Sequence, residues 1–488
     1  MATTLFLGGA FFMILLGAAA IFGGALGIAL LLARDRSLVL MVAVVASLIF
    51  PVHKLLGPFV EGTHAGAPGL VVSSTMLVLG LLYVAWMVEG TFVRDVVRAF
   101  RRPVFWTPLA AMFLACFSVG AARNDYLVLS QLVYWSFMYA LFLYFGARVH
   151  TRNEIGWILL TFGAIALLEA GVVVLQKVGI IGLGLLAADA ESVGRTTDIG
   201  TIGRPFGTLV HPVFLGITVA TIAVVALAFA LYLRRTWIRL VCVVIVLACL
   251  GQIYLAYARG PLLGVVPALV VVLAIGAAHH RVSARAWTAG IFAVLIGAIA
   301  LSPQIEQFYE RNFGSRHFGL EVNSRTQLND VGWRMIEDSP LVGVGLNNFT
   351  QVMDEYTEEP LIFPGYPSHN LFILTAAETG LVGLAGLLAI GIALAWNSVA
   401  LLGSRDPLFR AMGAAMLGIL LLHLVAEQLS YSLRQEVPLT VFWIFAGMTM
   451  ACVRIREDER RARRPVRTPR PARPPVGASA PEPVPVGV

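Results

Sequence analysis

The stretch PVFLGITVATIAVVALAFALYL (residues 212–233) decides the class of this protein. Its 22 residues contain no charged side chain, and about 20 apolar residues suffice for a helix to cross a hydrocarbon core of roughly 30 Å. The rest of the 488-residue chain follows the same pattern: 58% of its residues are hydrophobic, 13% are charged, and the mean hydropathy is +0.82. Soluble domains carry about 25% charged residues. We therefore predict an all-α integral membrane protein.

Thirteen apolar stretches divide the chain, which predicts 12–13 transmembrane helices. The first stretch lacks the basic start and cleavage site of a signal peptide, so we expect it to be retained as a span, although its glycines can split it. The stretches lie near residues 5–33, 37–56, 69–89, 104–121, 127–147, 155–175, 209–233, 237–257, 260–278, 286–302, 369–398, 408–427 and 436–453.

Arginine is concentrated in alternate connections between these spans, such as RDR (34–36), VRDVVRAFRR (93–102) and RVHTR (148–152). Because short basic loops stay in the cytoplasm, we expect these loops and the C-terminus to be cytoplasmic. The outward connections are then those near 176–208, 256–260, 303–368 and 428–435. The net charge of +7 reflects this topology and does not indicate nucleic-acid binding.

Four regions follow from this division. Residues 1–302 form an N-terminal transmembrane bundle with a polar outward loop at 176–208. Residues 303–368 form an outward loop domain, which is too long for a simple connection. Residues 369–454 form the C-terminal transmembrane helices. Residues 455–488 are basic and rich in proline, and we expect a disordered cytoplasmic tail that contacts anionic lipid.

The loop domain contains one clear helix signal, SRTQLNDVGWRMI (324–336). Ser324 is the expected N-cap, with Gln327 three residues later. Apolar residues then recur at helical spacing: Leu328, Val331, Met335 and Ile336. We therefore expect a loop helix that begins at Ser324 and buries this face.

Ionisable and polar residues gather at the outward ends of several spans, where charged groups are costly and often functional. They are Arg204, His211, Arg259, Arg325, His369 and Asn370. Taken singly, each also has a purely structural interpretation. An arginine at such a position can reach lipid headgroups or lie on a solvated helix face, and a histidine can cap a helix.

Together on one side of the membrane, these arginines and histidines suit the binding of a phosphate group and the transfer of a proton. The guanidinium fork of arginine matches phosphate oxygens and stays charged, and histidine can take a proton from a hydroxyl near neutral pH. The sequence contains no metal-ligand motif such as HExxH or DxD, and its four cysteines form no CxxC pair. We expect a diphosphate ligand, a proton-transfer step, and neither a metal nor another cofactor.

At these residues the chain resembles the bacterial O-antigen ligase and O-antigen polymerase superfamily. The matching stretches are RPFGTLVHPVFLG (204–216), ARGPLLG (258–264), SRTQLNDVGWRMIEDSPLVGVGLNNF (324–349) and HNLFILTAAETGLVGL (369–384). Their order also matches, and the resemblance covers roughly residues 150–450. One departure is Ala258, where a serine is frequent in the family.

The resemblance implies an inverting, metal-independent membrane glycosyltransferase with a GT-C-like fold. It would act at the periplasmic face of the bacterial inner membrane. The implied donor is a glycan on undecaprenyl diphosphate, and the implied acceptor is a hydroxyl of lipid A–core (ligase) or of another lipid-linked glycan (polymerase). Further partners would be membrane lipids and envelope polysaccharide assembly proteins, and the products would be O-antigen or exopolysaccharide.

The resemblance also implies residue roles. Arg204 and Arg259 would bind the donor diphosphate, and His369 would position or deprotonate the acceptor hydroxyl. Three further residues, Arg325, His211 and Asn370, are candidates for substrate binding, although His211 also fits a structural role.

Two other classes of protein are alternatives, and arginines between membrane helices serve a transporter as well as a glycosyltransferase. A transporter or flippase of a lipid-linked glycan would need polar residues along a path open to both faces, whereas the polar residues here crowd the outward side. A non-catalytic envelope scaffold is the third hypothesis. Neither ligase nor polymerase is favoured by the sequence, because both use the same donor.

Overall fold

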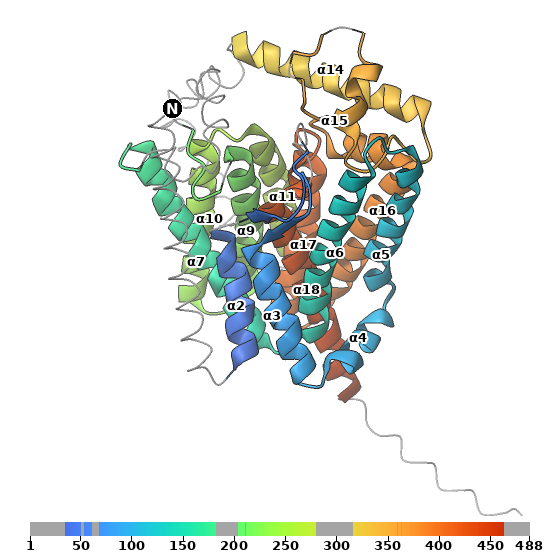
Figure 1. Ribbon diagram of the computed structural model, residues 1–488. Helices are drawn as coiled ribbons and strands as arrows, with labels where there is room; N and C mark the ends of the chain where they lie inside the picture. Colours follow the sequence, from blue (N-terminus) through green and yellow to red (C-terminus); the bar gives the residue numbers. More distant parts are fainter. Residues whose placement is uncertain are drawn as a thin grey trace, which may run out of the picture.

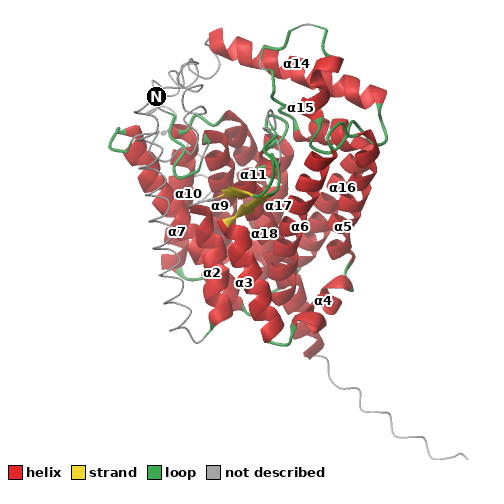
Figure 2. Cartoon of the chain, viewed as in Figure 1, coloured by secondary structure: helices red, strands yellow, loops and turns green. Residues whose placement is uncertain are grey.

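The computed structural model describes residues 35–49, 53–60, 68–181, 204–209, 211–279 and 316–462, without residues 359 and 363. Almost all of the ordered elements are helices (Figures 1 and 2). They are α2 (Arg36–Ala46), α3 (Ser74–Val88), α4 (Phe92–Phe100), α5 (Pro103–Cys116), α6 (Asp125–Arg148), α7 (Arg152–Lys177), α9 (Pro212–Tyr232), α10 (Thr236–Leu255), α11 (Arg259–Ala278), α14 (Arg316–Asp338), α15 (Phe349–Val352), α16 (Leu371–Leu402), α17 (Pro407–Ala426) and α18 (Glu436–Ala462).

Nine helices in the described part of the chain are long and apolar enough to cross a membrane, and α3 with α4 forms a further pair bent by 105°. The nine are α5 with its following 3-10 turn, α6, α7, α9, α10, α11, α16, α17 and α18. The structure thus confirms an all-α integral membrane protein. The predicted spans 5–33 and 286–302 lie outside the described residues.

Burial separates the inner helices of the bundle from the outer ones. In α18, 94% of the apolar window is buried, compared with 33% in each of α10, α11 and α16. The centre is formed by α18 against α6 and α17, while α9 packs on α10, α11 and α17. Helices that are apolar all round suit both positions, because lipid replaces protein neighbours on the outer ones.

The predicted spans 37–56 and 69–89 are only partly helical. After α2 and the 3-10 turn Ser47–Ile49, strand β1 (His53–Leu55) pairs antiparallel with β2 (Val71–Ser73). A helix continued from α2 would need the amide that Pro51 lacks. Ser73 then caps α3 by accepting a hydrogen bond from the amide of Met76, so the second helix begins five residues later than predicted.

The loop domain lies across one end of the bundle (Figure 1). Its long helix α14 begins at Arg316, so the predicted start at Ser324 is wrong: Ser324 lies inside the helix and its side chain is buried. The predicted apolar face is confirmed, since all four of its residues are at most 7% exposed: Leu328, Val331, Met335 and Ile336. This face packs against α15 and the first turns of α16.

The opposite end of the bundle carries α4 and the end of α18 (Figure 1). Helix α18 continues to Ala462, so the predicted tail boundary at 455 is wrong by eight residues, and residues 463–488 lie outside the described part. The predicted sidedness requires the loop domain and the C-terminal end of α18 to lie at opposite ends, and they do.

Candidate functional site

The segment that carries Arg204 is folded against the C-terminal half of α7. The side-chain oxygen of Gln176 accepts hydrogen bonds from the amides of Phe206 (3.1 Å) and Gly207 (2.9 Å), and its Nε2 donates to Gly207 O (2.8 Å). The buried carboxylate of Glu169 accepts from the amide of Thr208 at 2.9 Å. Two polar residues of a membrane helix thus hold residues 206–208 in place.

Gly207 is required for this fold. Its φ of 65° is one that side chains rarely adopt, and an added Cβ would lie 1.9 Å from Glu169 Oε2. The glycine of the RPFG motif therefore allows the loop to approach α7 closely.

Arg204 reaches from this segment to the hairpin between α10 and α11. Its Nε donates to Ala256 O and its Nη2 donates to Tyr257 O, both at 3.0 Å. Arg259 follows two residues later as the first residue of α11. The structure thus brings the two predicted diphosphate ligands, 55 residues apart in sequence, to the same hairpin.

The packing behind this hairpin is tight. A Cβ added to Gly216 of α9 would lie 2.8 Å from the Cβ of Ala258 and 2.9 Å from Pro261 Cγ. Ala258 is itself buried. The position where the family often has serine is therefore occupied here by a small side chain packed against α9.

Lys177 is a cation of this region that the sequence analysis did not select. It is the last residue of α7, and its Nζ lies 5.2 Å from the ring centroid of Tyr257, whose carbonyl accepts from Arg204. The sequence does contain a signal that could have selected it, because Lys177 is one of two lysines in the chain and ends an apolar span.

His369 and Asn370, predicted as the first residues of a span, lie directly before α16, which begins at Leu371. Asn370 is the N-cap: its Oδ1 accepts from the amides of Phe372 (2.9 Å) and Ile373 (3.2 Å), while its Nδ2 donates to Gln428 Oε1 (2.9 Å). These contacts give Asn370 a structural role, and its predicted contact with substrate stays a prediction. The ring of His369 lies 5.1 Å from that of Tyr431.

The connection between α17 and α18, residues 427–435, contacts the start of α16, the Arg325 side chain and the start of α11. Leu371 N, at the start of α16, donates to Glu427 O at 2.9 Å. Arg325 Nη1 donates to Leu429 O at 2.9 Å. A Cβ added to Gly260, next to Arg259, would lie 3.8 Å from the Cβ of Leu429. The starts of α11 and α16 and the Arg325 side chain therefore meet on one short segment.

Glu427 holds this connecting segment in shape. Its side chain is fully buried and accepts hydrogen bonds from the hydroxyls of Ser432 and Ser430 (3.4 Å), and it lies 3.3 Å from Nδ1 of His423. Sequence reasoning noted this connection only as an outward loop, because nothing in its composition reveals that its carbonyl groups are the shared contacts.

His211 is the N-cap of α9, and its Nδ1 accepts from the amide of Val213 at 3.2 Å. Burial lowers the pKa of His211 to about 4, and the positive charges of Arg204 and Arg325 contribute to the same shift. His211 is therefore neutral at pH 7 and fits the structural role. The two arginines that act on it come from different segments, so Arg325 also belongs to this cluster.

Below His369, α16 is broken at Gly380 (φ 67°, ψ 179°). Residues 340–345 of the loop domain fill the break: Val344 N donates to Ala377 O (2.9 Å), Gly345 N to Glu378 O (3.0 Å), and Leu381 N to Pro340 O (2.8 Å). The predicted span at 369–398 is confirmed as Leu371–Leu402, and the structure adds a break within it. Backbone groups freed at membrane depth need such partners.

A buried ion pair lies beside this break. Arg434 Nη2 donates to the Glu378 carboxylate, and both side chains are 2% exposed. The guanidinium of Arg434 also lies 5.6 Å from the ring centroid of Trp135 in α6. The pair connects α16, the segment 427–435 and α6 beneath the candidate site.

Among the described residues, no three His, Cys, Asp or Glu side chains come together in a way that could hold a metal ion. Four cationic side chains belong to the segments that meet at this end: Lys177, Arg204, Arg259 and Arg325. Such a set suits a ligand with several negative charges.

Residues 244–388 match the family described as O-Antigen ligase. This match supports membership of the O-antigen ligase and polymerase superfamily. The matched segment includes Arg259, Arg325, His369 and the break at Gly380, whereas Arg204 and residues 427–435 lie outside it. No curated protein matches the chain. The match and the nine apolar helices of the described residues together support a multi-pass membrane protein of the O-antigen ligase type.

Proposed function

We propose that this protein transfers a glycan from undecaprenyl diphosphate to a sugar hydroxyl at the periplasmic face of the bacterial inner membrane. The observation that carries the proposal is the convergence of a histidine and several cations at one end of the bundle. Arg204 is bound to the α10–α11 hairpin that leads to Arg259, and Arg325 and His369 both contact segment 427–435.

In this proposal Arg204 and Arg259 bind the donor diphosphate. The carbonyls of Ala256 and Tyr257 fix the orientation of the Arg204 guanidinium while leaving its charge uncompensated by those contacts. Cations held in place before the reaction stabilise the negative charge that develops on a leaving group, and removal of one such donor typically costs about 10²–10³ in rate.

His369 is the proposed base. Its ring takes the proton of the acceptor hydroxyl while that oxygen forms a bond to the anomeric carbon from the face opposite the diphosphate. The bond between that carbon and the diphosphate oxygen breaks, and undecaprenyl diphosphate leaves with the electron pair. This single displacement inverts the anomeric centre and requires no metal. The histidine directly precedes the N-cap Asn370, and its ring lies beside that of Tyr431, with centroids 5.1 Å apart.

The test uses the full-length protein in liposomes that contain undecaprenyl-diphosphate glycan and either lipid A–core or a second lipid-linked glycan. A product on lipid A–core identifies a ligase, and an elongated lipid-linked glycan identifies a polymerase. Donor that crosses the bilayer with no new glycosidic bond would instead support the transporter hypothesis and overturn the proposal.

A further inference from the structure

Helix α4 lies at the end of the bundle opposite the candidate site (Figure 1). It connects α3 to the membrane-spanning α5 and is bent by 105° from α3. Because α3 is apolar throughout and α5 crosses the membrane, a helix turned by this angle between them lies near the plane of the membrane surface. Its sequence FVRDVVRAF alternates apolar and charged residues, as interfacial helices do.

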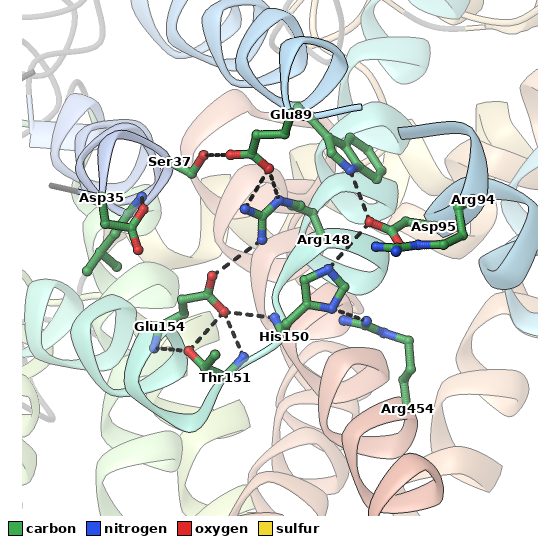
Figure 3. Close-up of polar contacts among 12 residues, drawn as sticks. Asp35, Ser37, Glu89, Arg94, Asp95, Arg148, His150, Thr151, Glu154 and Arg454 are labelled. Atoms are coloured by element: carbon green, nitrogen blue, oxygen red, sulfur yellow. Dashed lines mark hydrogen bonds and ion pairs between the residues drawn. The ribbon is translucent and has the colours of Figure 1, made fainter. Parts of the chain in front are cut away.

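One face of α4 is anchored to the bundle. Asp95 is 3% exposed and accepts a hydrogen bond from Trp86 Nε1 at 3.3 Å, and its carboxylate lies 3.4 Å from His150 Nε2 (Figure 3). Nδ1 of His150 in turn lies 2.6 Å from Arg454 Nη1. Phe92 packs edge-on against Trp86, with ring centroids 4.9 Å apart. These contacts fix the helix and therefore the direction of its other face.

The other face of α4 opens a cleft of about 550 Å³ toward the end of α18. Five arginines line it, together with two valines and one glutamate. They are Arg94, Arg98, Arg101, Arg102 and Arg461, with Val93, Val97 and Glu457. Arginine at this density matches phosphate groups, which it binds through its planar fork.

The charges of the cleft do not balance. Three of the arginines pair with carboxylates: Arg94 with Asp95 at 3.1 Å, Arg102 with Glu457 at 2.8 Å, and Arg98 with Asp458. Arg101 and Arg461 have no ion-pair partner among the residues that the structure describes. Two positive charges therefore remain in excess within a preformed cleft.

Apolar side chains place this cleft at the level of lipid headgroups. Trp106, in the first turn of α5, is 55% exposed, and its Nε1 donates to Phe100 O at 2.8 Å. Exposed tryptophan marks the membrane interface. Val93 and Val97 on α4 are 69% and 52% exposed. An occupant with both a phosphate and acyl chains would cover all of these side chains.

We propose that the α4 cleft binds the phosphodiester headgroup of an anionic phospholipid, with acyl chains along Val93, Val97 and Trp106. A lipid with two phosphodiesters, such as cardiolipin, matches the two excess charges, and phosphatidylglycerol matches one. This site is separate from the glycan-transfer site and does not depend on the proposed function.

The experiment measures binding of cardiolipin, phosphatidylglycerol and phosphatidylcholine to the full-length detergent-solubilised protein by native mass spectrometry. The test variant is Arg94→Gln/Arg101→Gln. The control is Arg36→Gln/Arg405→Gln, which removes two exposed arginines outside the cleft. We expect cardiolipin binding to fall on the order of tenfold or more in the test variant and by less than twofold in the control.

Circular dichroism and thermal unfolding of both variants verify that they are folded. Wild-type cardiolipin binding by the folded test variant would overturn the proposal, and so would an equal loss in the control. Inorganic phosphate at millimolar concentration is a further arm. If it displaces cardiolipin, the cleft recognises free phosphate, and the assignment to a lipid is wrong.

Discussion

At the end of the bundle that carries α14, two arginines of the candidate site donate to main-chain carbonyls: Arg204 to Ala256 and Tyr257, and Arg325 to Leu429. At the opposite end, Arg152 instead pairs with two carboxylates, those of Asp406 and Glu459. A carbonyl orients a guanidinium without cancelling its charge, whereas a carboxylate neutralises it. The first arrangement suits an anionic substrate, and the second ties helices together.

We expect the largest loss of glycan transfer from His369→Ala, because the candidate site contains the proposed base and the opposite end contains none. We expect a folded, membrane-inserted protein whose glycan transfer falls by about 10²–10⁴-fold, the usual contribution of a positioned base. The measurement is product formation in liposomes with lipid-linked donor. His279→Asn, at the other end of α11, is the control and should transfer normally. Full activity of the His369 variant would remove this residue from the mechanism.

Lysine in place of arginine tests the difference between the two ends directly. We expect Arg204→Lys and Arg259→Lys each to lower transfer by about 10²-fold, because a point charge lacks the fork geometry. The control is Arg152→Lys at the opposite end, which should stay within a few-fold of wild type, since partly exposed ion pairs contribute about 0–1 kcal/mol. An equal loss of transfer in the Arg152 variant would show that the arginines of the candidate site have no special role in the reaction.

The break in α16 is expected to determine how firmly the loop domain is held at the site. Gly380→Ala places a side chain at φ 67° with its Cβ 2.0 Å from Leu341 O. Backbone strain of this kind costs about 1–3 kcal/mol, and displacement of the loop adds to that cost. Gly391→Ala in the same helix is the control, since nothing lies within 4 Å of its added Cβ. Thermal unfolding in detergent should show a lower Tm for the first variant alone.

These contacts also mark what the sequence could and could not predict. Apolar length alone located α6, α9 and α18, because a membrane helix satisfies its own backbone. The break at Gly380 was missed because a group that fills it, the carbonyl of Pro340, is distant in sequence and the surrounding run is largely apolar. The strand pair at His53–Leu55 was missed for the same reason: pairing between distant segments leaves no periodic signal.

The candidate site likewise contains residues that the sequence could single out and residues that only the fold reveals. Residue type and position at helix ends single out Arg204, Arg259 and His369 as candidates, and the structure brings their segments together, while their roles stay predictions. The role of segment 427–435 was not predictable, because it acts through the carbonyls of Glu427 and Leu429. Main-chain groups are the same in every sequence, so only the fold reveals which of them converge.

Lys177 gives a smaller test of whether the cationic cluster extends beyond the arginines. We expect Lys177→Gln to weaken binding of the lipid-linked donor about fivefold, because it removes one charge next to the Tyr257 ring. Lys54→Gln, at the chain's other lysine, is the control. Donor binding to the reconstituted protein can be measured by competition with a labelled donor. An unchanged affinity would restrict the diphosphate site to the arginines.

The smallest expected effect is a pH dependence of stability caused by His211. The pKa of this residue is about 4 in the folded protein, below its ordinary value of about 6.5. As the pH falls from about 6.5 to about 4, the unfolded chain binds a proton that the folded chain does not, so the contribution of His211 to stability is lost over this range. Asn can replace its Nδ1 as an N-cap acceptor. His211→Asn should therefore flatten the dependence of Tm on pH between 6.5 and 4, whereas an unchanged slope would mean that burial and the two arginines do not lower the pKa of this histidine.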